Sequence, residues 1–205
     1  MLPTFLTFYT NEAYREDAQR LGRCCRHFGL PFEMARGEER GGWKRNCNQK
    51  PLLLERARRR LAGPLVWLDS DCVIHRRPSA LLRRREEDAV LWMAGVSEKH
   101  YVSSQVMWWG DTPVARAMIA DWAERARGRP ESLADPLLKE VCDAWRGRAA
   151  VGRLPASYGK PYWKPVPGVR FDCIVISSNE RRSVHPDATP RQDRRRLCPL
   201  RLPYA

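Results

Sequence analysis

The sequence predicts a single α/β domain in which a mostly parallel central sheet is flanked by helices. Apolar strand segments alternate with amphipathic helical segments, as in proteins built from β-α-β units. The run LVWL at 65–68 is short and wholly apolar, which is typical of a strand in the middle of a parallel sheet. A chain of 205 residues suffices for one domain with a sizeable core. We expect this domain to span residues 1–178 and the arginine- and proline-rich segment 179–205 to form a basic arm packed over it.

The first quarter of the chain predicts a β-α-β opening. Residues 4–10 read as a β-rich apolar strand, and Asn11 suits the N-cap of a helix that Gly29 ends. Residues 30–35 predict a second strand. The polar, glycine-bearing stretch 35–49 then predicts a loop.

The rest of the chain continues the alternation of strands and helices. Pro51 suits the first turn of a helix that Gly63 ends, and Thr112 and Pro113 suit the start of a helix that Gly128 closes. The remaining elements that the sequence predicts are a strand at 65–68, a short helix at 78–86, strands at 89–95 and 103–110, a helix beginning near Asp135 and a late strand at 171–178.

Composition and missing motifs exclude several classes of protein. No stretch approaches the roughly 18 apolar residues that span a bilayer, and the start of the chain has no basic leader. The seven cysteines form no C-x-x-C pair and no zinc spacing, so we expect reduced thiols in a cytoplasmic protein. The absence of G-x-G-x-x-G, P-loop and G-x-S-x-G motifs argues against a dinucleotide site, a nucleoside-triphosphatase and an α/β-hydrolase.

An acid pair follows the predicted central strand, in the segment PLVWLDSDCVIH at 64–75. Asp69 and Asp71 come directly after LVWL, at the carboxyl edge of the sheet, where open α/β folds bind ligands. Residues i and i+2 of an extended segment face the same side about 7 Å apart. Two such carboxylates, exposed as ligands, suit a hard cation such as Mn²⁺ or Mg²⁺ that bridges phosphates. A solvated turn is the alternative, and we expect His75 to be structural.

The segment LVWLDSDCVIHRRP resembles the D-x-D segment of nucleotide-sugar glycosyltransferases with the GT-A fold, where an apolar strand delivers two acids to a metal and to the donor's diphosphate. The opening TFLTFYTN is similar to the strand that cradles the nucleoside, and NQKPLLLERARRRL to the Lys-Pro helix before the D-x-D strand. SSQVMWWGDTPVARAMIADW resembles the acceptor-side strand and helix, and GRLPASYGK the late Leu-Pro-x-x-Tyr turn. The resemblance covers most of the chain. It implies a Rossmann-like GT-A domain that uses a divalent metal and a nucleotide-sugar donor, with a UDP-sugar expected.

The resemblance also implies roles for particular residues. Asp69, Asp71 and His185, the only histidine after His100, are the implied metal ligands. Asp135 stands where many relatives carry an acidic pair, and it is the candidate base of an inverting reaction. The residues expected to bind the donor are Thr7, Tyr9, Thr10, Lys44, Lys50, Asp69 and Ser70.

The charge of the chain bears on the acceptor. The 37 basic and 24 acidic residues give a net charge of +13, which favours a polyanionic partner. The first hypothesis is therefore a phage-type DNA glycosyltransferase that places a sugar on a hydroxymethylated pyrimidine. A glycosyltransferase acting on a lipid-linked or surface glycan is the second, and a non-enzymatic basic module that binds nucleic acid is the third. We infer no obligate protein partner.

Arginine clusters and aromatic residues are the candidate contacts to DNA. Phosphate contacts dominate affinity for a duplex, and a base must leave the helix to reach a sugar donor. Arginines are clustered at 83–85, 181–182 and 194–196. The residues expected on the acceptor side are Ser104, Gln105, Trp108, Trp109, Arg194, Arg195 and Arg196, with core packing as the alternative role of the two tryptophans.

Overall fold

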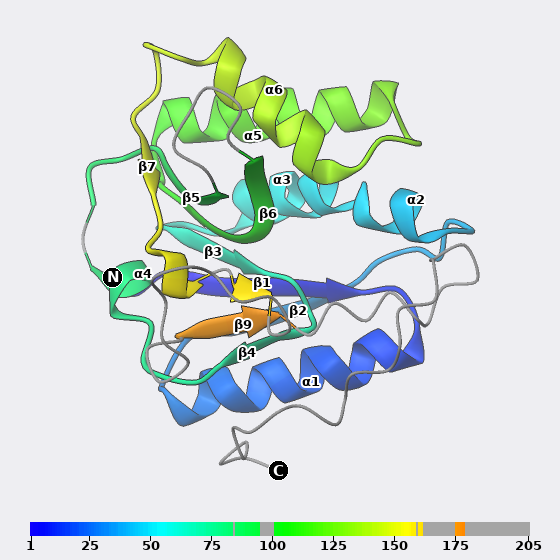
Figure 1. Ribbon diagram of the computed structural model, residues 1–205, viewed down its shortest axis with the longest axis vertical. Coiled ribbons are helices and arrows are strands. Elements are labelled where there is room, and N and C mark those ends of the chain that lie inside the picture. The colour runs from blue at the N-terminus through cyan, green and yellow to red at the C-terminus, as the bar shows by residue number, and fades with distance from the viewer. Residues whose placement is uncertain (84, 95–100, 159, 162–174, 179–205) are drawn as a thin grey trace.

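A computed structural model describes residues 1–83, 85–94, 101–158, 160–161 and 175–178, and it confirms an α/β fold with a mostly parallel central sheet between helices (Figure 1). The main sheet has six strands in the order β2-β1-β3-β6-β5-β7. Three of its five pairings, β1 with β2, β1 with β3 and β5 with β7, are parallel, and β6 runs antiparallel to both neighbours. The six strands are β1 (Thr4–Tyr9), β2 (Phe32–Arg36), β3 (Leu65–Leu68), β5 (Ala89–Ala94), β6 (Tyr101–Trp109) and β7 (Val151–Arg153).

Helices cover both faces of this sheet. The helix α1 (Glu12–His27) packs on one face, and α3 (Lys50–Arg60), α5 (Pro113–Gly128) and α6 (Ala134–Ala144) pack on the other (Figure 1). The core is accordingly divided into two apolar clusters, one on each side of the sheet. The strand β3 is buried along its whole length, as its apolar sequence predicts.

The helix boundaries follow local signals in the sequence. The Asn11 side chain accepts a hydrogen bond from the backbone N–H of Tyr14, and Thr112 caps α5 in the same way through Ala115. Gly29, just after α1, has a φ of 65°, a left-handed conformation that glycine adopts without strain. These caps fix where α1 leaves β1 and where α5 leaves β6.

Several short elements were not expected. A helix, α2 (Trp43–Cys47), lies inside the predicted loop 35–49, and α4 (Ser79–Leu82) is shorter than predicted. A second sheet, in the order β4-β9-β8, lies on the α1 side. It consists of β4 (Cys72–Ile74), β8 (Lys160–Pro161) and β9 (Ile176–Ser178), with the 3₁₀ turn η1 (Ala156–Tyr158) before it. Strands of two or three residues carry no readable alternation, so periodicity cannot find them.

Some expectations concern segments beyond these elements. The first part of the strand predicted at 171–178 and the whole arm 179–205 lie outside the described residues. Five cysteines in the described part of the chain are free thiols. No helix in that part is long and apolar enough to cross a bilayer.

Candidate active site

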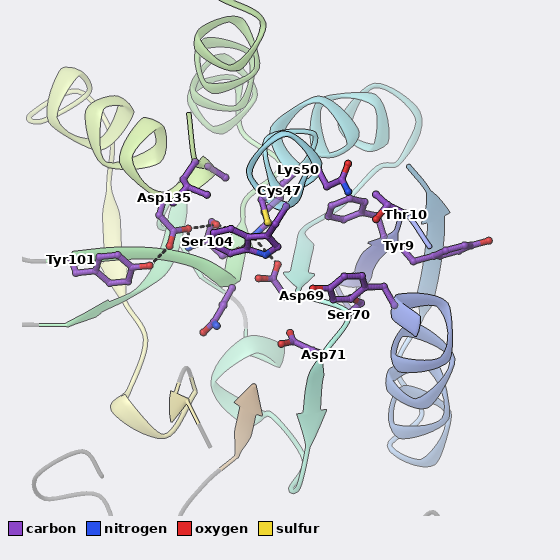
Figure 2. A pocket seen from close by; sticks show the side chains of 17 residues that line it. Tyr9, Thr10, Cys47, Lys50, Asp69, Ser70, Asp71, Tyr101, Ser104 and Asp135 are labelled. Atoms are coloured by element: carbon purple, nitrogen blue, oxygen red, sulfur yellow. Dashed lines mark hydrogen bonds and ion pairs between the residues drawn. The ribbon is translucent and has the colours of Figure 1, made fainter. Parts of the chain in front are cut away.

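A pocket of about 170 Å³ lies at the carboxyl edge of the main sheet (Figure 2). The ends of β1 and β3 form its floor together with the first half of β6, and the starts of α1, α3 and α6 and the short α2 form its walls. Nine residues that the sequence singled out line it: Tyr9, Thr10, Lys50, Asp69, Ser70, Asp71, Ser104, Gln105 and Asp135.

The topology explains why distant segments meet there. β1 and β3 are parallel neighbours, so Tyr9 and Asp69 leave the sheet at the same edge. β6 runs antiparallel to β3, which brings its beginning to that edge as well. The backbone N–H of Asp69 donates to the carbonyl of Gln105 at 2.9 Å, and this bond fixes the acid pair against β6.

The centre of the pocket is an ion pair between Lys50 and Asp69. The Lys50 Nζ lies 2.7 Å from Asp69 Oδ1, and it also donates to the carbonyl and hydroxyl oxygens of Ser104. The Trp67 indole N–H donates to the same carboxylate at 3.1 Å. Burial disfavours the charged amine, but the facing carboxylates of Asp69 and Asp135 outweigh it and raise the pKa of Lys50, so the ammonium form persists.

The acid pair is less exposed than free metal ligands were expected to be. The Asp69 side chain is 25% exposed and Asp71 is 8% exposed. The expectation that both acids are exposed is therefore wrong. β4 begins at Cys72, directly after the pair, and packs with α1 in one apolar cluster.

Asp135 is held by three donors on β6. Its Oδ1 accepts from the backbone N–H of Ser104 at 3.0 Å and from the Ser104 hydroxyl, and its Oδ2 accepts from the Tyr101 hydroxyl. Because Lys50 donates to the same Ser104 hydroxyl, a continuous chain of polar contacts joins Asp135 to Asp69 (Figure 2). The start of α6 and the end of β3 are thereby fixed relative to each other.

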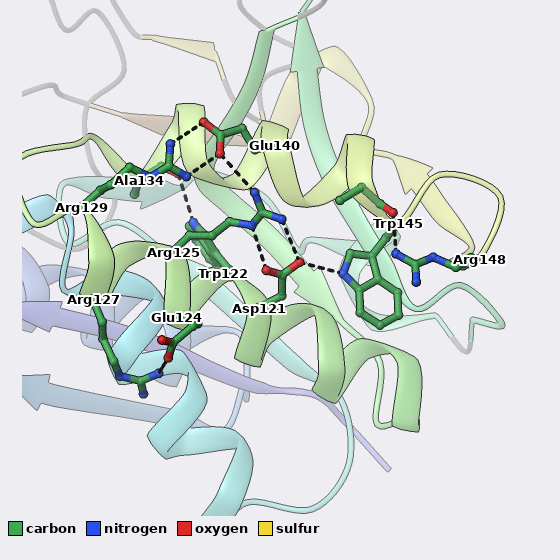
Figure 3. A network of polar contacts seen from close by, with 11 residues as sticks. Asp121, Trp122, Glu124, Arg125, Arg127, Arg129, Ala134, Glu140, Trp145 and Arg148 are labelled. Carbon is green, nitrogen blue, oxygen red and sulfur yellow. Dashed lines mark hydrogen bonds and ion pairs between the residues drawn. The ribbon is translucent and has the colours of Figure 1, made fainter.

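A network of polar contacts joins α5 to α6, the helix that carries Asp135 (Figure 3). The Trp122 indole N–H donates to the carbonyl of Ala134, the residue before Asp135. Arg125 and Arg129 both pair with Glu140, one turn and more along α6. These contacts leave α6 little freedom to rotate its first turn away from the pocket.

The two carboxylates are suitable ligands for a hard divalent cation, but they provide only part of the ligand set that such an ion needs. Asp69 and Asp71 both offer oxygen ligands to the pocket, which Mn²⁺ and Mg²⁺ prefer. One oxygen of Asp69, however, already accepts from Lys50 and Trp67. Across the described ranges, no group of three His, Cys, Asp or Glu side chains is arranged to hold a metal. An ion bound at this edge needs further ligands from a bound diphosphate or from elsewhere in the chain.

The structure places four predicted residues away from the pocket. Thr7 is 2% exposed and buried within β1, and Lys44 is exposed on α2 without lining the pocket. Trp108 and Trp109 are 3% and 0% exposed and lie in opposite halves of the core. The predicted acceptor contact is therefore not available to either tryptophan, because successive residues of a central strand point into both packed faces.

Other predicted residues lie beyond the described part of the chain or in structural positions. His185, the implied third metal ligand, and the arginines at 194–196 lie outside the described residues. In the 83–85 cluster, the Arg85 side chain is turned inward, pairs with Glu87 and stacks over Trp108, so it is structural. His75 is half-buried, and desolvation lowers its pKa.

The pocket also contains residues that the sequence did not single out: Phe8, Tyr14, Trp43, Asn46, Cys47 and Tyr101. Burial raises the pKa of the Cys47 thiol to about 12 and also raises that of the Tyr14 hydroxyl, so both groups are neutral. A tryptophan in the otherwise polar stretch GGWKRN was a readable signal for Trp43, since a large aromatic side chain in a polar loop needs a surface to pack on.

The six-stranded sheet between helices matches the fold of GT-A glycosyltransferase structures. A glycosyltransferase involved in the glycosylation of the major capsid of PBCV-1 shares it with a TM-score of 0.64 and 10% identity, over 87% of this chain and 94% of that one. The galactosyltransferase LgtC, crystallised with donor and acceptor sugar analogues, matches with a TM-score of 0.55 and 8% identity, over 85% and 86% of the two chains.

A third structure is larger than this chain. The glycosyltransferase GlyE of Streptococcus pneumoniae TIGR4 matches with a TM-score of 0.53 and 11% identity, over 78% of this chain and 46% of its own. No family model matches the sequence, and no curated protein matches it. At these identities the likeness establishes a shared fold, and the expected GT-A architecture is confirmed.

Proposed function

We propose that the protein is a glycosyltransferase that moves a sugar from a nucleotide sugar to an acceptor hydroxyl. The observation that carries this proposal is the meeting of Asp69, Asp71 and Lys50 in one pocket at the carboxyl edge of the GT-A fold. A module that only binds nucleic acid has no use for two carboxylates there, since they repel phosphate.

The reaction releases a nucleoside diphosphate, and negative charge grows on the oxygen that joins it to the sugar. Lys50 is a buried cation held beside the acid pair, so it stabilises that charge without reorganising. A divalent metal, when bound by Asp69 and Asp71, supplies further positive charge as a Lewis acid. Tyr9 and Thr10 line the donor end of the pocket in this proposal.

The activity is tested first without any acceptor. The protein is incubated with a panel of UDP-, GDP-, ADP- and TDP-sugars, and nucleoside diphosphate release is measured. We expect slow hydrolysis of one donor class, with UDP-sugars the first choice. Binding and hydrolysis of none of these donors would contradict the proposed function.

The metal is expected to matter for this hydrolysis. EDTA should lower the rate at least about tenfold and Mn²⁺ should restore it, because a bound cation stabilises the leaving diphosphate. Calorimetry of Mn²⁺ binding in the presence of the nucleoside diphosphate gives a direct measurement. If His185 is a ligand, His185→Ala weakens that binding by at least about tenfold, because loss of even a residue that only hydrogen-bonds to a metal ligand typically costs this much in metal affinity. An unchanged rate in EDTA would remove the metal from the proposal.

For the acceptor, we propose a hydroxymethylated pyrimidine in DNA, which makes the protein an enzyme of DNA hypermodification. The support is the net charge of +13, because basic residues bind the phosphates of a duplex whatever the base sequence of the DNA. Arg85 points inward and pairs with Glu87, so we no longer count it among the candidate phosphate contacts. Arg194, Arg195 and Arg196 stay the candidates in the sequence.

The acceptor is tested with a panel of hydroxymethylated duplex DNA, unmodified duplex DNA and a lipid-linked saccharide, with mass spectrometry of the products. We expect a sugar to be added to the hydroxymethylated duplex alone. The logarithm of the duplex affinity should fall linearly with that of the salt concentration, by about 0.9 per phosphate contact. Alanine at 194–196 should reduce this slope by up to about three units while sparing donor hydrolysis. Transfer to the saccharide alone would establish the glycan alternative instead.

A further inference from the structure

Tyr101 combines exposure with a fixed position at the edge of the pocket. It opens β6 and is 52% exposed, and it is the one aromatic residue among the exposed large hydrophobic side chains of the described part of the chain. It also lines the pocket. An exposed aromatic ring at the edge of a pocket offers a face on which a flat ring can stack.

The hydroxyl of Tyr101 anchors the ring. It donates to Asp135 Oδ2, while the other oxygen of that carboxylate is held by the backbone and side chain of Ser104. The ring therefore has a defined orientation before any ligand binds. A tyrosine with two side-chain torsions, already held at its tip, loses little entropy on binding.

The ring lies on the side of the pocket opposite the proposed donor residues. Figure 2 shows Tyr101 and Asp135 on one side of Asp69, and Tyr9 and Thr10 on the other. If the nucleotide sugar occupies the Tyr9 side, its sugar points toward the side of Tyr101. In this arrangement the acceptor hydroxyl approaches from the side of Tyr101.

We propose that the exposed face of Tyr101 is the platform on which the acceptor pyrimidine stacks after it has left the duplex. This inference rests on the proposed function and gives the stacking role to Tyr101 in place of Trp108 and Trp109, which are buried. Every base has a π-face, and an extruded base loses its neighbours in the helix, so an aromatic platform replaces part of the lost stacking. Ser104 and Gln105, on the same strand, line the same pocket.

The experiment compares two substitutions of one residue. Tyr101→Ala removes the ring, and Tyr101→Phe keeps the ring but removes the hydroxyl that reaches Asp135. With hydroxymethylated duplex DNA as acceptor, we expect Tyr101→Ala to raise the acceptor KM by about 5–150-fold, the range for loss of one stacked base. Tyr101→Phe should keep this KM within about threefold of the wild type. Donor hydrolysis without acceptor is measured in the wild type and in both variants as a reference rate, and the acceptor KM alone decides the proposal.

A matched control is Met34→Ala, which removes another exposed apolar side chain, on β2 and outside this pocket. It should change neither KM nor hydrolysis. Equal KM increases in the Ala and Phe variants would overturn the proposal, because they would assign the effect to the hydroxyl and Asp135. An unchanged KM in Tyr101→Ala would also overturn it, as would the same KM increase with a saccharide acceptor and no product on DNA. Absence of donor hydrolysis in the wild type would instead contradict the proposed function itself.

Discussion

Replacing Asp71 with asparagine is expected to lower the rate of donor hydrolysis and of sugar transfer by about 100–1,000-fold. The Asp71 carboxylate lines the same pocket as the ion pair of Lys50 and Asp69. In the proposed reaction it holds the cation at the donor's diphosphate. Loss of one preorganised electrostatic contact to a developing charge typically costs a factor of this size. Asparagine keeps the shape of the side chain and removes its charge. The measurement is nucleoside diphosphate release at saturating donor.

A stability measurement separates this effect from unfolding. Asp71→Asn should lower the thermal midpoint by about 2–4 °C, because the substitution is isosteric and a typical loss of about 1 kcal/mol gives this shift for a domain of this size. Asp143→Asn is the matched control, since Asp143 is a surface acid of α6 that pairs with Lys139 and Arg146. It should leave the rate unchanged. Full activity of Asp71→Asn in a folded protein would refute the role of the acid pair.

Replacing Lys50 with methionine is expected to destabilise the fold and to slow the reaction. Lys50 is 4% exposed, and its ammonium is shared between Asp69 and two oxygens of Ser104. Removing one partner of a buried ion pair leaves the other uncompensated, at a typical cost of about 3–5 kcal/mol. Asp69 is partly exposed, so water stabilises its unpaired carboxylate in part, and we expect the free energy of unfolding to fall by about 3 kcal/mol. For a domain of this size the thermal midpoint should fall by roughly 6–12 °C.

The coupling between the two residues gives a sharper test. In the double variant Lys50→Met/Asp69→Asn the Asp69 carboxylate is no longer left without its ion-pair partner, so the double variant should be more stable than the sum of the single losses implies. Lys139→Met is the matched control, because Lys139 pairs with Asp143 on the surface, where such pairs contribute about 0–1 kcal/mol. Equal losses of stability in Lys50→Met and Lys139→Met would show that the buried pair of Lys50 contributes no more to stability than a surface pair.

The parts of the fold that sequence reasoning predicted are those encoded locally. Asn11 and Thr112 cap α1 and α5 through bonds to residues three positions away, so their signals are complete within a few residues. The direction of β6 depends instead on its pairing with β5, the strand before it, and with β3, which is distant in sequence. The three-residue strands β4 and β7 are strands only because a neighbour binds them.

The candidate site shows the same division. The pair Asp69 and Asp71 was readable because it follows an apolar strand directly, and the Lys-Pro start of α3 was readable by resemblance. Tyr101 was missed, because its position depends on where β6 begins and on Asp135 of α6, more than 30 residues later. Trp108 and Trp109 were misplaced because both faces of a central strand are packed, and a sequence does not reveal how many layers cover it.

The strand order also has a consequence for how the protein is made. β3 lies between β1, which leaves the ribosome before it, and β6, which is complete only when residue 109 has been added. Until then the wholly apolar β3 has one open edge, and an open apolar edge is a template for pairing with other chains. Slow synthesis between these two strands therefore lengthens the time during which a nascent chain can aggregate, and chaperones that cover apolar strands act most usefully in that interval.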